Sequence, residues 1–266
     1  MAEGSWGILR VLDKETPNLR PLRGHEVIPT SATTVCPEGA PRKAFNASAM
    51  DKGLIFNPRS AEEAIEVDFG RMLQLANPAG KIFMLDDDKV QVASGAQPMP
   101  LTLHVNVGDG VQVNLKNSLA AGRVSFHADN LAYDPLQSQG INIGNNPGDQ
   151  TIGPGEQKTY TFYAHPEIGE NAALVQDFGN PMTHQRDGLF GAIVIGPKGS
   201  LYRDPVTGAD ISLKNSWRAD VILDPSLPQN AGRANYRDFA LYFQDEDNIL
   251  GTSFMPYLQK TAGLIT

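Results

Sequence analysis

The sequence is poor in cysteine, in basic residues and in long apolar runs, and each shortage removes a class of protein. Cys36 is the only cysteine, so no disulfide can form within the chain. Lysine and arginine together number 22 against 30 aspartates and glutamates, which gives a net charge of -8. Nucleic-acid binding needs a basic surface that displaces counterions from phosphates, so we predict no nucleic-acid partner.

Long apolar segments are also missing. No run of about 18 apolar residues occurs, so we predict no membrane-spanning helix and no membrane partner. The first residues do not form a basic segment followed by an apolar core, so the sequence as given shows no export signal. We therefore expect a soluble chain, and the single cysteine leaves its compartment open.

Turn-forming residues, in contrast, are plentiful. The chain has 26 glycines and 19 prolines, and 41% of its residues are hydrophobic. This composition supports a sizeable core, and it favours many short strands joined by turns over long helices. The predicted fold class is all-β.

Three segments have the pattern of strands in a sandwich. Residues 124–130 alternate, with Phe126 on one face and His127 on the other, so we expect His127 to point away from the core. Residues 154–163 begin with a Pro-Gly turn and continue as an aromatic strand. Residues 188–195 form an apolar strand.

The remaining elements have weaker sequence signals. Residues 101–107 alternate with His104 on the solvated face, and the Gly-Asp-Gly turn after them predicts a hairpin with residues 111–115. Ser60, as a helix N-cap followed by acidic residues, predicts a short helix over 60–75. Further short strands are expected at residues 5–12, 43–56, 81–85, 216–223 and 239–244.

The order of these motifs resembles a known family. A histidine-bearing strand, then Pro-Gly-Glu with a Thr-Tyr-Thr-Phe-Tyr strand, then Gly-Leu-Phe-Gly-Ala-Ile-Val-Ile is similar to the plastocyanin-like (cupredoxin) domains of multicopper oxidases. The nearest likeness is to the large, many-domain bacterial oxidases that include manganese oxidases. The resemblance implies a Greek-key β-sandwich, copper as the family's cofactor, and an extracellular or cell-surface location.

The same resemblance suggests how the chain is divided. Residues 1–12 look like the closing strand of a preceding cupredoxin domain, and residues 13–42 form a proline-rich linker. Residues 43–200 correspond to one cupredoxin domain. Residues 201–266 hold a linker and strands that look like the opening of a following domain.

The copper ligands of the family are mostly missing. A type 1 copper needs a cysteine thiolate with two imidazoles, and Cys36 lies in the linker, far from the apolar strand at 188–195. A trinuclear centre is built from His-x-His pairs. The first pair reads His-Ala-Asp-Asn at 127–130, so Asp129 replaces the second ligand, and the second pair, in Val-Gln-Asp-Phe-Gly at 175–179, has lost both histidines.

Residue by residue, only His127 survives as a matched copper ligand. His165 and His184 are expected to be surface or hydrogen-bonding histidines. A mixed nitrogen and oxygen metal site from His127, Asp129, Asp177 and His184 remains an alternative, and His127, His184 and Asp129 are its candidate metal residues. A hydrolase triad of Ser125, His127 and Asp129 is disfavoured, because one strand would point all three side by side.

We therefore expect a cupredoxin-like segment of a multicopper oxidase that lacks most copper ligands and supports copper-bearing domains in the same or a partner chain. It would be part of an oxidoreductase, with no catalytic or cofactor-binding residues and no bound copper of its own. Its partners would be other cupredoxin domains or further copies of itself. The alternatives are a non-catalytic binding or assembly module, and a mononuclear metalloenzyme built on His127 and Asp129.

Overall fold

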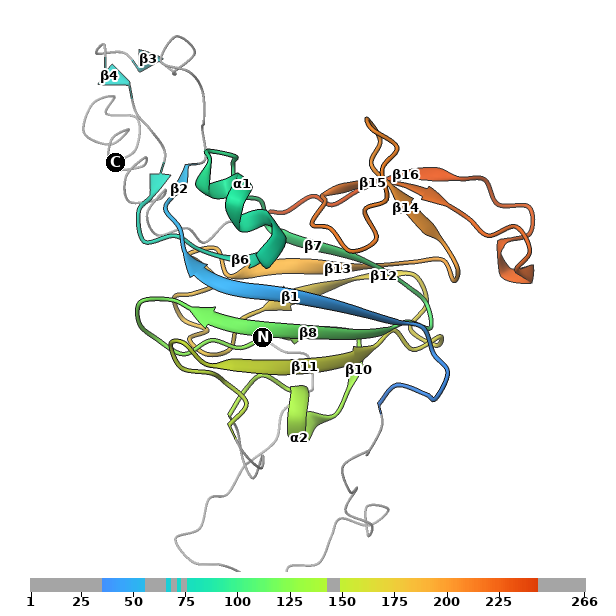
Figure 1. Cartoon of the computed structure of the whole chain (residues 1–266), viewed down its shortest axis with the longest axis horizontal. Coiled ribbons are helices and arrows are strands. Elements are labelled where there is room, and N and C mark those ends of the chain that lie inside the picture. Colours follow the sequence, from blue (N-terminus) through green and yellow to red (C-terminus); the bar gives the residue numbers. More distant parts are fainter. Residues whose placement is uncertain (1–34, 56–65, 68–70, 73–75, 143–148, 244–266) are drawn as a thin grey trace, which may run out of the picture. The chain divides into compact units, whose positions relative to one another are not determined.

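Two β-sheets face each other and form a sandwich (Figure 1). The structure is a computed structural model, and it describes residues 35–55, 66–67, 71–72, 76–142 and 149–243. The five-stranded sheet has the order β10(Ala132–Tyr133), β11(Gln157–Tyr163), β8(Gly110–Ser118), β1(Arg42–Asp51), β6(Lys81–Leu85). The four-stranded sheet has the order β7(Leu101–Asn106), β13(Phe190–Gly196), β12(Asn171–Gln176), β9(His127–Ala128).

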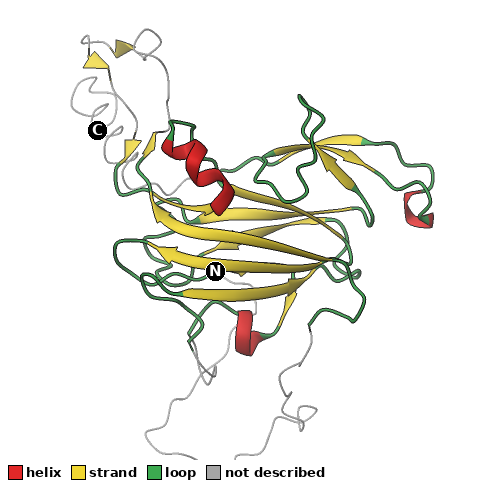
Figure 2. Ribbon diagram, in the orientation of Figure 1, coloured by secondary structure: helices red, strands yellow, loops and turns green. Residues whose placement is uncertain are grey.

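Strands dominate the described chain, and the helices are short (Figure 2). The helical elements are η1(Asp86–Asp88), α1(Lys89–Ala93), α2(Pro135–Ser138) and η2(Pro228–Asn230). None of the helices in the described part of the chain is long and apolar enough to cross a membrane. The predicted all-β, cupredoxin-like sandwich is therefore confirmed.

The core lies between the two sheets and is rich in aromatic rings. Phe126 packs edge-on against Phe83 at a centroid distance of 5.4 Å and lies 6.1 Å from Phe162. All three side chains are fully buried, and burial of a large apolar side chain stabilises the fold by roughly 1.5–3 kcal/mol. The alternation read from residues 124–130 and 154–163 therefore identified the inward faces correctly.

The predicted hairpin between residues 101–107 and 111–115 is wrong. β7 pairs in parallel with β13, whereas β8 pairs in parallel with β1 and antiparallel with β11. The turn at Gly108, which has a φ of 92°, carries the chain from one sheet to the other. Alternation shows which face of a strand is buried, but it does not choose the neighbouring strand, and this explains the error.

A third, three-stranded sheet packs against β7. Its strands are β14(Leu201–Arg203), β15(Arg218–Ile222) and β16(Tyr236–Phe239), and its small core includes Tyr202, Ile211, Ala219, Val221 and Leu223. The Ser216 backbone N–H donates to the Thr102 carbonyl at 3.2 Å, and the Tyr202 hydroxyl donates to the Val105 carbonyl at 2.6 Å. Every residue of β7 is consequently buried.

Two predictions about this part of the chain are corrected. His104 is 2% exposed rather than solvated, because the third sheet covers the face that alternation had assigned to water. The strand predicted at 239–244 lies earlier, at Tyr236–Phe239, and residue 244 is outside the described residues. The strand predicted at 216–223 is confirmed as β15.

The helix predicted over residues 60–75 is also wrong where the structure describes it. β3(Glu66–Val67) pairs antiparallel with β4(Arg71–Met72), and β2(Leu54–Ile55) pairs with β5(Ala76–Asn77). A cap and a few acidic residues are weak preferences, and a short helix needs tertiary packing to form. The predicted strand at 5–12 and most of the predicted linker lie outside the described residues.

Candidate metal centre

The four residues that the resemblance places at the family's His-x-His positions come together in the structure, and we call them the corner: His127, Asp129, Gln176 and Phe178. His127 of β9 is directly opposite Gln176 of β12 in the strand register. The His127 ring lies 5.0 Å from the Phe178 ring and 3.1 Å, through Nε2, from Oδ1 of Asp129. Gln176 Nε2 donates to the other carboxylate oxygen of Asp129 at 2.9 Å.

His127 is buried, although it lies, as predicted, on the face of its strand that points away from the core. Only 6% of the residue is exposed, because the segment that contains α2 covers this face of β9. Tyr133 of that segment places its ring 5.3 Å from the imidazole, and the Gln139 carbonyl lies 2.8 Å from Nδ1. Alternation predicted the correct face of the strand, but the segment with α2, which follows later in the sequence, covers that face.

Both ring nitrogens of His127 face oxygen atoms. A carbonyl oxygen can only accept, so Nδ1 carries a hydrogen and donates to Gln139, while Nε2 faces the Asp129 carboxylate. A chain of hydrogen bonds runs from Asp129 to Gln176, whose Oε1 accepts from Gln185 Nε2 at 2.9 Å. The corner is thus closed by side-chain hydrogen bonds.

The pKa of Tyr133 reflects this environment. Burial, and after it the negative charge of Asp129, raises the pKa of Tyr133 above its ordinary value. Its hydroxyl therefore stays protonated at neutral pH and faces Gln139 Oε1 at 3.4 Å.

A second polar pair, Asp177 and His184, lies beside the corner. Asp177 is fully buried, and its Oδ2 lies 2.8 Å from His184 Nδ1. Its carboxylate also accepts hydrogen bonds from the backbone N–H groups of Ser125, Gly179 and Asn180 at 2.6, 2.9 and 3.1 Å. Charge-assisted bonds of this kind fix a buried carboxylate firmly, so Asp177 anchors the segment that follows β12.

The other predicted arrangements can now be placed. Ser125 Oγ accepts from the Phe178 N–H at 2.9 Å and faces Asp177, not His127, so the structure does not assemble the disfavoured triad. His184 is buried and hydrogen-bonded, whereas about 44% of the His165 side chain is exposed.

The structure brings His127 to Asp129, and His184 to Asp177, as two separate pairs. Across the described ranges, no three His, Cys, Asp or Glu side chains gather into a group that could hold a metal ion. Metal binding by His127, Asp129 or His184 stays a prediction. The sequence reading missed Gln139 and Gln185. Gln176 could have been found, because it occupies a motif position, but nothing in the sequence links Gln139 or Gln185 to His127.

Comparison with known proteins gives the class of this domain. Residues 79–200 match the model of a multicopper oxidase family. A multi-copper oxidase from Pseudomonas thermotolerans is 16% identical, with 61% of this chain and 31% of that chain covered and a TM-score of 0.39. A blue copper oxidase from Nitrosomonas europaea is 19% identical, with 62% and 41% covered and a TM-score of 0.39. Among curated proteins, none matches.

Residues 79–200 are therefore similar to a multicopper oxidase domain, and the resemblance seen in the sequence is confirmed for this segment. This segment is a little under half of the 266 residues. The chain spans about a third to two fifths of the length of the two solved oxidases.

Proposed function

We propose that this chain is a cupredoxin-type segment of a multicopper oxidase that holds no copper at the corner and supports copper-bearing domains supplied elsewhere. The observation that carries the proposal is the set of polar contacts that joins His127, Asp129, Gln176 and Gln185. It occupies the place where the family's motifs would set imidazoles around copper.

The chemistry of the donor set supports this reading. A multinuclear copper centre needs several neutral imidazoles, each with a nitrogen lone pair turned to the metal. The corner supplies one imidazole, and both of its nitrogens already face oxygen atoms. An amide, a carboxylate and a phenyl ring stand where the other ligands would be. This set does not fit copper of the family type.

The replacement side chains have a structural role instead. Asp129 and Gln176 hydrogen-bond across β9 and β12, which keeps the two strands together where a shared metal would otherwise link them. The domain then acts as a rigid support. The copper, the substrate site and the oxidase activity would belong to other cupredoxin domains, in the same polypeptide, in a partner chain or in further copies, at an extracellular or cell-surface location.

Copper analysis of the full chain tests the proposal. The protein is loaded with copper, freed of excess metal and measured by elemental analysis and electron paramagnetic resonance. We expect well under one copper per chain, and the same content in His127→Ala. A stoichiometric copper that His127→Ala removes would contradict the proposal and would favour the mononuclear site at His127 and Asp129.

A matched variant separates loss of ligands from loss of the scaffold. Asp129→His, Gln176→His and Phe178→His, made together, place four imidazoles in the corner. We expect this variant to gain bound copper that the wild-type chain does not hold. Suppose that the variant folds, as judged by circular dichroism, and still binds no more copper than wild type. In that case the three substituted side chains do not explain why the wild-type chain lacks copper, and the proposal is contradicted.

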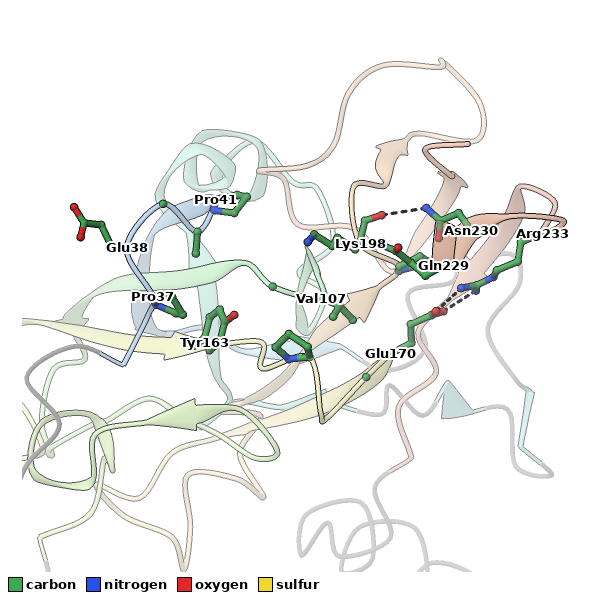
Figure 3. Close-up of a pocket in the computed structure, with 16 residues that line it drawn as sticks. Pro37, Glu38, Pro41, Val107, Tyr163, Glu170, Lys198, Gln229, Asn230 and Arg233 are labelled. Carbon is green, nitrogen blue, oxygen red and sulfur yellow. Dashed lines mark hydrogen bonds and ion pairs between the residues drawn. The ribbon is translucent and has the colours of Figure 1, made fainter. Parts of the chain in front are cut away.

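A second candidate role is a non-catalytic binding or assembly module. It is favoured by a separate observation, a hollow of about 610 Å³ at another end of the sandwich, lined by residues that include Tyr163, Lys198 and Asn230 (Figure 3). Oxidase assays after mixing with copper-bearing domains distinguish the two roles, because a supporting segment should raise their activity and an independent binding module should not.

A further inference from the structure

The third sheet buries a face of β7 that is polar. β7 lies at the edge of the four-stranded sheet, and its side chains that point away from the main core are Thr102, His104 and Asn106. All three residues are buried, at 0, 2 and 8% exposure. The strand thus has the alternating pattern of one whose outer face meets water, although another sheet covers that face. Uncovering these side chains would expose little apolar surface of β7.

Hydrogen bonds make much of the contact between β7 and the third sheet. The Thr102 N–H donates to Asn215 Oδ1 at 2.8 Å, and the Thr102 carbonyl accepts from the Ser216 N–H at 3.2 Å. Asn106 Nδ2 donates to the Ser200 carbonyl at 3.0 Å. Water can replace each partner when the two surfaces separate, so such bonds contribute little net free energy. The contact is therefore one that can open without unfolding either side.

The third sheet has a core of its own. Its strands, orange to red in Figure 1, are joined to one another by antiparallel pairing. Tyr202, Ala219 and Val221 belong to a cluster of buried side chains that is separate from the main core between the two large sheets. Parts of a chain that have separate cores and a polar contact are the ones that move relative to each other.

His104 makes this contact sensitive to protons. Its Nε2 lies 2.9 Å from the Ser216 carbonyl, which can only accept, so Nε2 carries a hydrogen. Nδ1 is buried and has no partner in the part of the chain that the structure describes. A second proton on the ring would go to Nδ1 and would place a charge there without an acceptor. The docked ring is therefore held neutral, whereas an imidazole in water takes up this proton near pH 6.5.

The charged groups around the ring do not offset this penalty. The ammonium of Lys43 lies 2.9 Å from the His104 carbonyl oxygen and 3.8 Å from the Asp109 carboxylate. Burial lowers the pKa of His104, and the charge of Lys43 acts in the same direction. Asp238 of β16 opposes both effects only in part. The other titratable groups of the elements around this cluster are Tyr202, Tyr236 and Asp210.

We propose that the third sheet is an acid-released cover, which separates from β7 as a unit while the sandwich stays folded. The open form exposes His104 to water, and the ring then binds a proton that the docked form does not bind. The equilibrium constant for opening therefore rises by about tenfold between pH 7.5 and pH 5.5. Opening also frees the backbone N–H and carbonyl of Thr102 at the sheet edge, where another strand could pair. The proposal does not depend on the corner or on copper.

Hydrogen exchange of the full chain tests the proposal. The reporters are the amides of Thr102 and Ser216, whose bonds cross the contact, and the reference amides are those of β8 and β11. Exchange is measured at pH 7.5 and 5.5 and corrected for the intrinsic effect of pH. We expect the reporters to be at least tenfold less protected than the reference amides, and to lose about tenfold more protection at pH 5.5.

Two outcomes of this measurement would overturn the proposal. Reporters as strongly protected as the reference amides would mean that they exchange only when the whole sandwich unfolds. A loss of protection below about twofold between the two pH values would mean that opening takes up no proton.

Two variants assign the proton to His104. His104→Gln keeps a donor for the Ser216 carbonyl and takes up no proton, so its reporters should show no loss of protection at pH 5.5. His165→Gln makes the same exchange at a ring that is about 44% exposed, and it should keep the wild-type loss. Asp109, whose pKa burial raises, is unchanged in both variants. An equal loss in wild type and His104→Gln would refute the proposal, and protected reference amides show that each variant is folded.

Discussion

Lowering the pH below about 6.5 should destabilise the protein through one buried imidazole, that of His104. The ring is 2% exposed and lies 4.9 Å from the Tyr202 ring, between β7 and the third sheet. Its Nε2 bonds to the Ser216 carbonyl at 2.9 Å, and Nδ1 is buried without a partner among the described residues. A proton on Nδ1 would therefore place an uncompensated charge inside the protein.

The direction of the pH dependence follows from this environment. Desolvation by burial lowers the pKa of His104 below its ordinary value, and Lys43 adds to this effect, whereas the Ser216 carbonyl and Asp238 partly oppose it. The unfolded chain takes up the proton near pH 6.5 and the folded chain only at lower pH. Stability is thus complete above pH 6.5 and decreases as the pH falls below it, because the unfolded state then binds more protons.

The magnitude can be bounded. If the folded ring stays neutral down to pH 5.5, the free energy of unfolding decreases by about 1.4 kcal/mol between pH 7.5 and pH 5.5 on account of His104 alone. Asp109, whose pKa is raised by burial, also titrates in this region of the structure. The contribution of His104 is therefore isolated by comparing wild type with a variant that does not titrate at this position.

The assay is urea unfolding of wild type and His104→Gln at pH 7.5, 6.5 and 5.5. Glutamine can still donate to the Ser216 carbonyl but takes up no proton, so the variant should lose less free energy than wild type over this range, by up to about 1.4 kcal/mol. His165→Gln is the matched control, because it makes the same exchange at a ring that is about 44% exposed. If His104→Gln and wild type lose the same free energy, the reasoning about the buried ring is refuted.

Three further changes test the packing around the sheets, each by chemical denaturation. Tyr202→Phe leaves the Val105 carbonyl without its 2.6 Å donor and should destabilise the protein by about 1–3 kcal/mol, and a loss below about 0.5 kcal/mol would contradict this. Gly196→Ala places a methyl group against the Tyr202 hydroxyl and should cost about 1–3 kcal/mol, part of which Tyr202→Phe should recover. Asp177→Asn removes the charge that His184 and three backbone N–H groups share, with an expected loss of about 1.5–3 kcal/mol, and wild-type stability would count against its anchoring role.

Much of the fold was accessible from local patterns. The strands at residues 81–85, 101–107 and 154–163 follow from alternation and turn chemistry, which depend only on neighbouring residues. The prediction that the His-x-His pairs are missing rests on the sequence in the same way, because residue types at motif positions need no coordinates. The helix predicted at 60–75 failed because its signals were weak local preferences that pairing elsewhere overrode.

The surroundings of the two misjudged histidines lay beyond such patterns. Alternation put His104 and His127 on the faces opposite the core, and it was correct about the faces. The third sheet covers the first ring, and the segment with α2 covers the second. Neither contact has a signal near the histidine itself, since Ser216 is separated from His104 by 112 positions.

The order of amino acids was sufficient to predict a β-sandwich that resembles a multicopper oxidase domain, and it also predicts other residue types at the positions of the copper ligands. Tertiary packing alone decided that His127 is enclosed, that its nitrogens face Gln139 and Asp129, and that a hollow forms at another end of the sheets. The reason is physical. Residue type determines which atoms could bind a ligand, whereas neighbours from distant parts of the chain determine which of those atoms are already occupied.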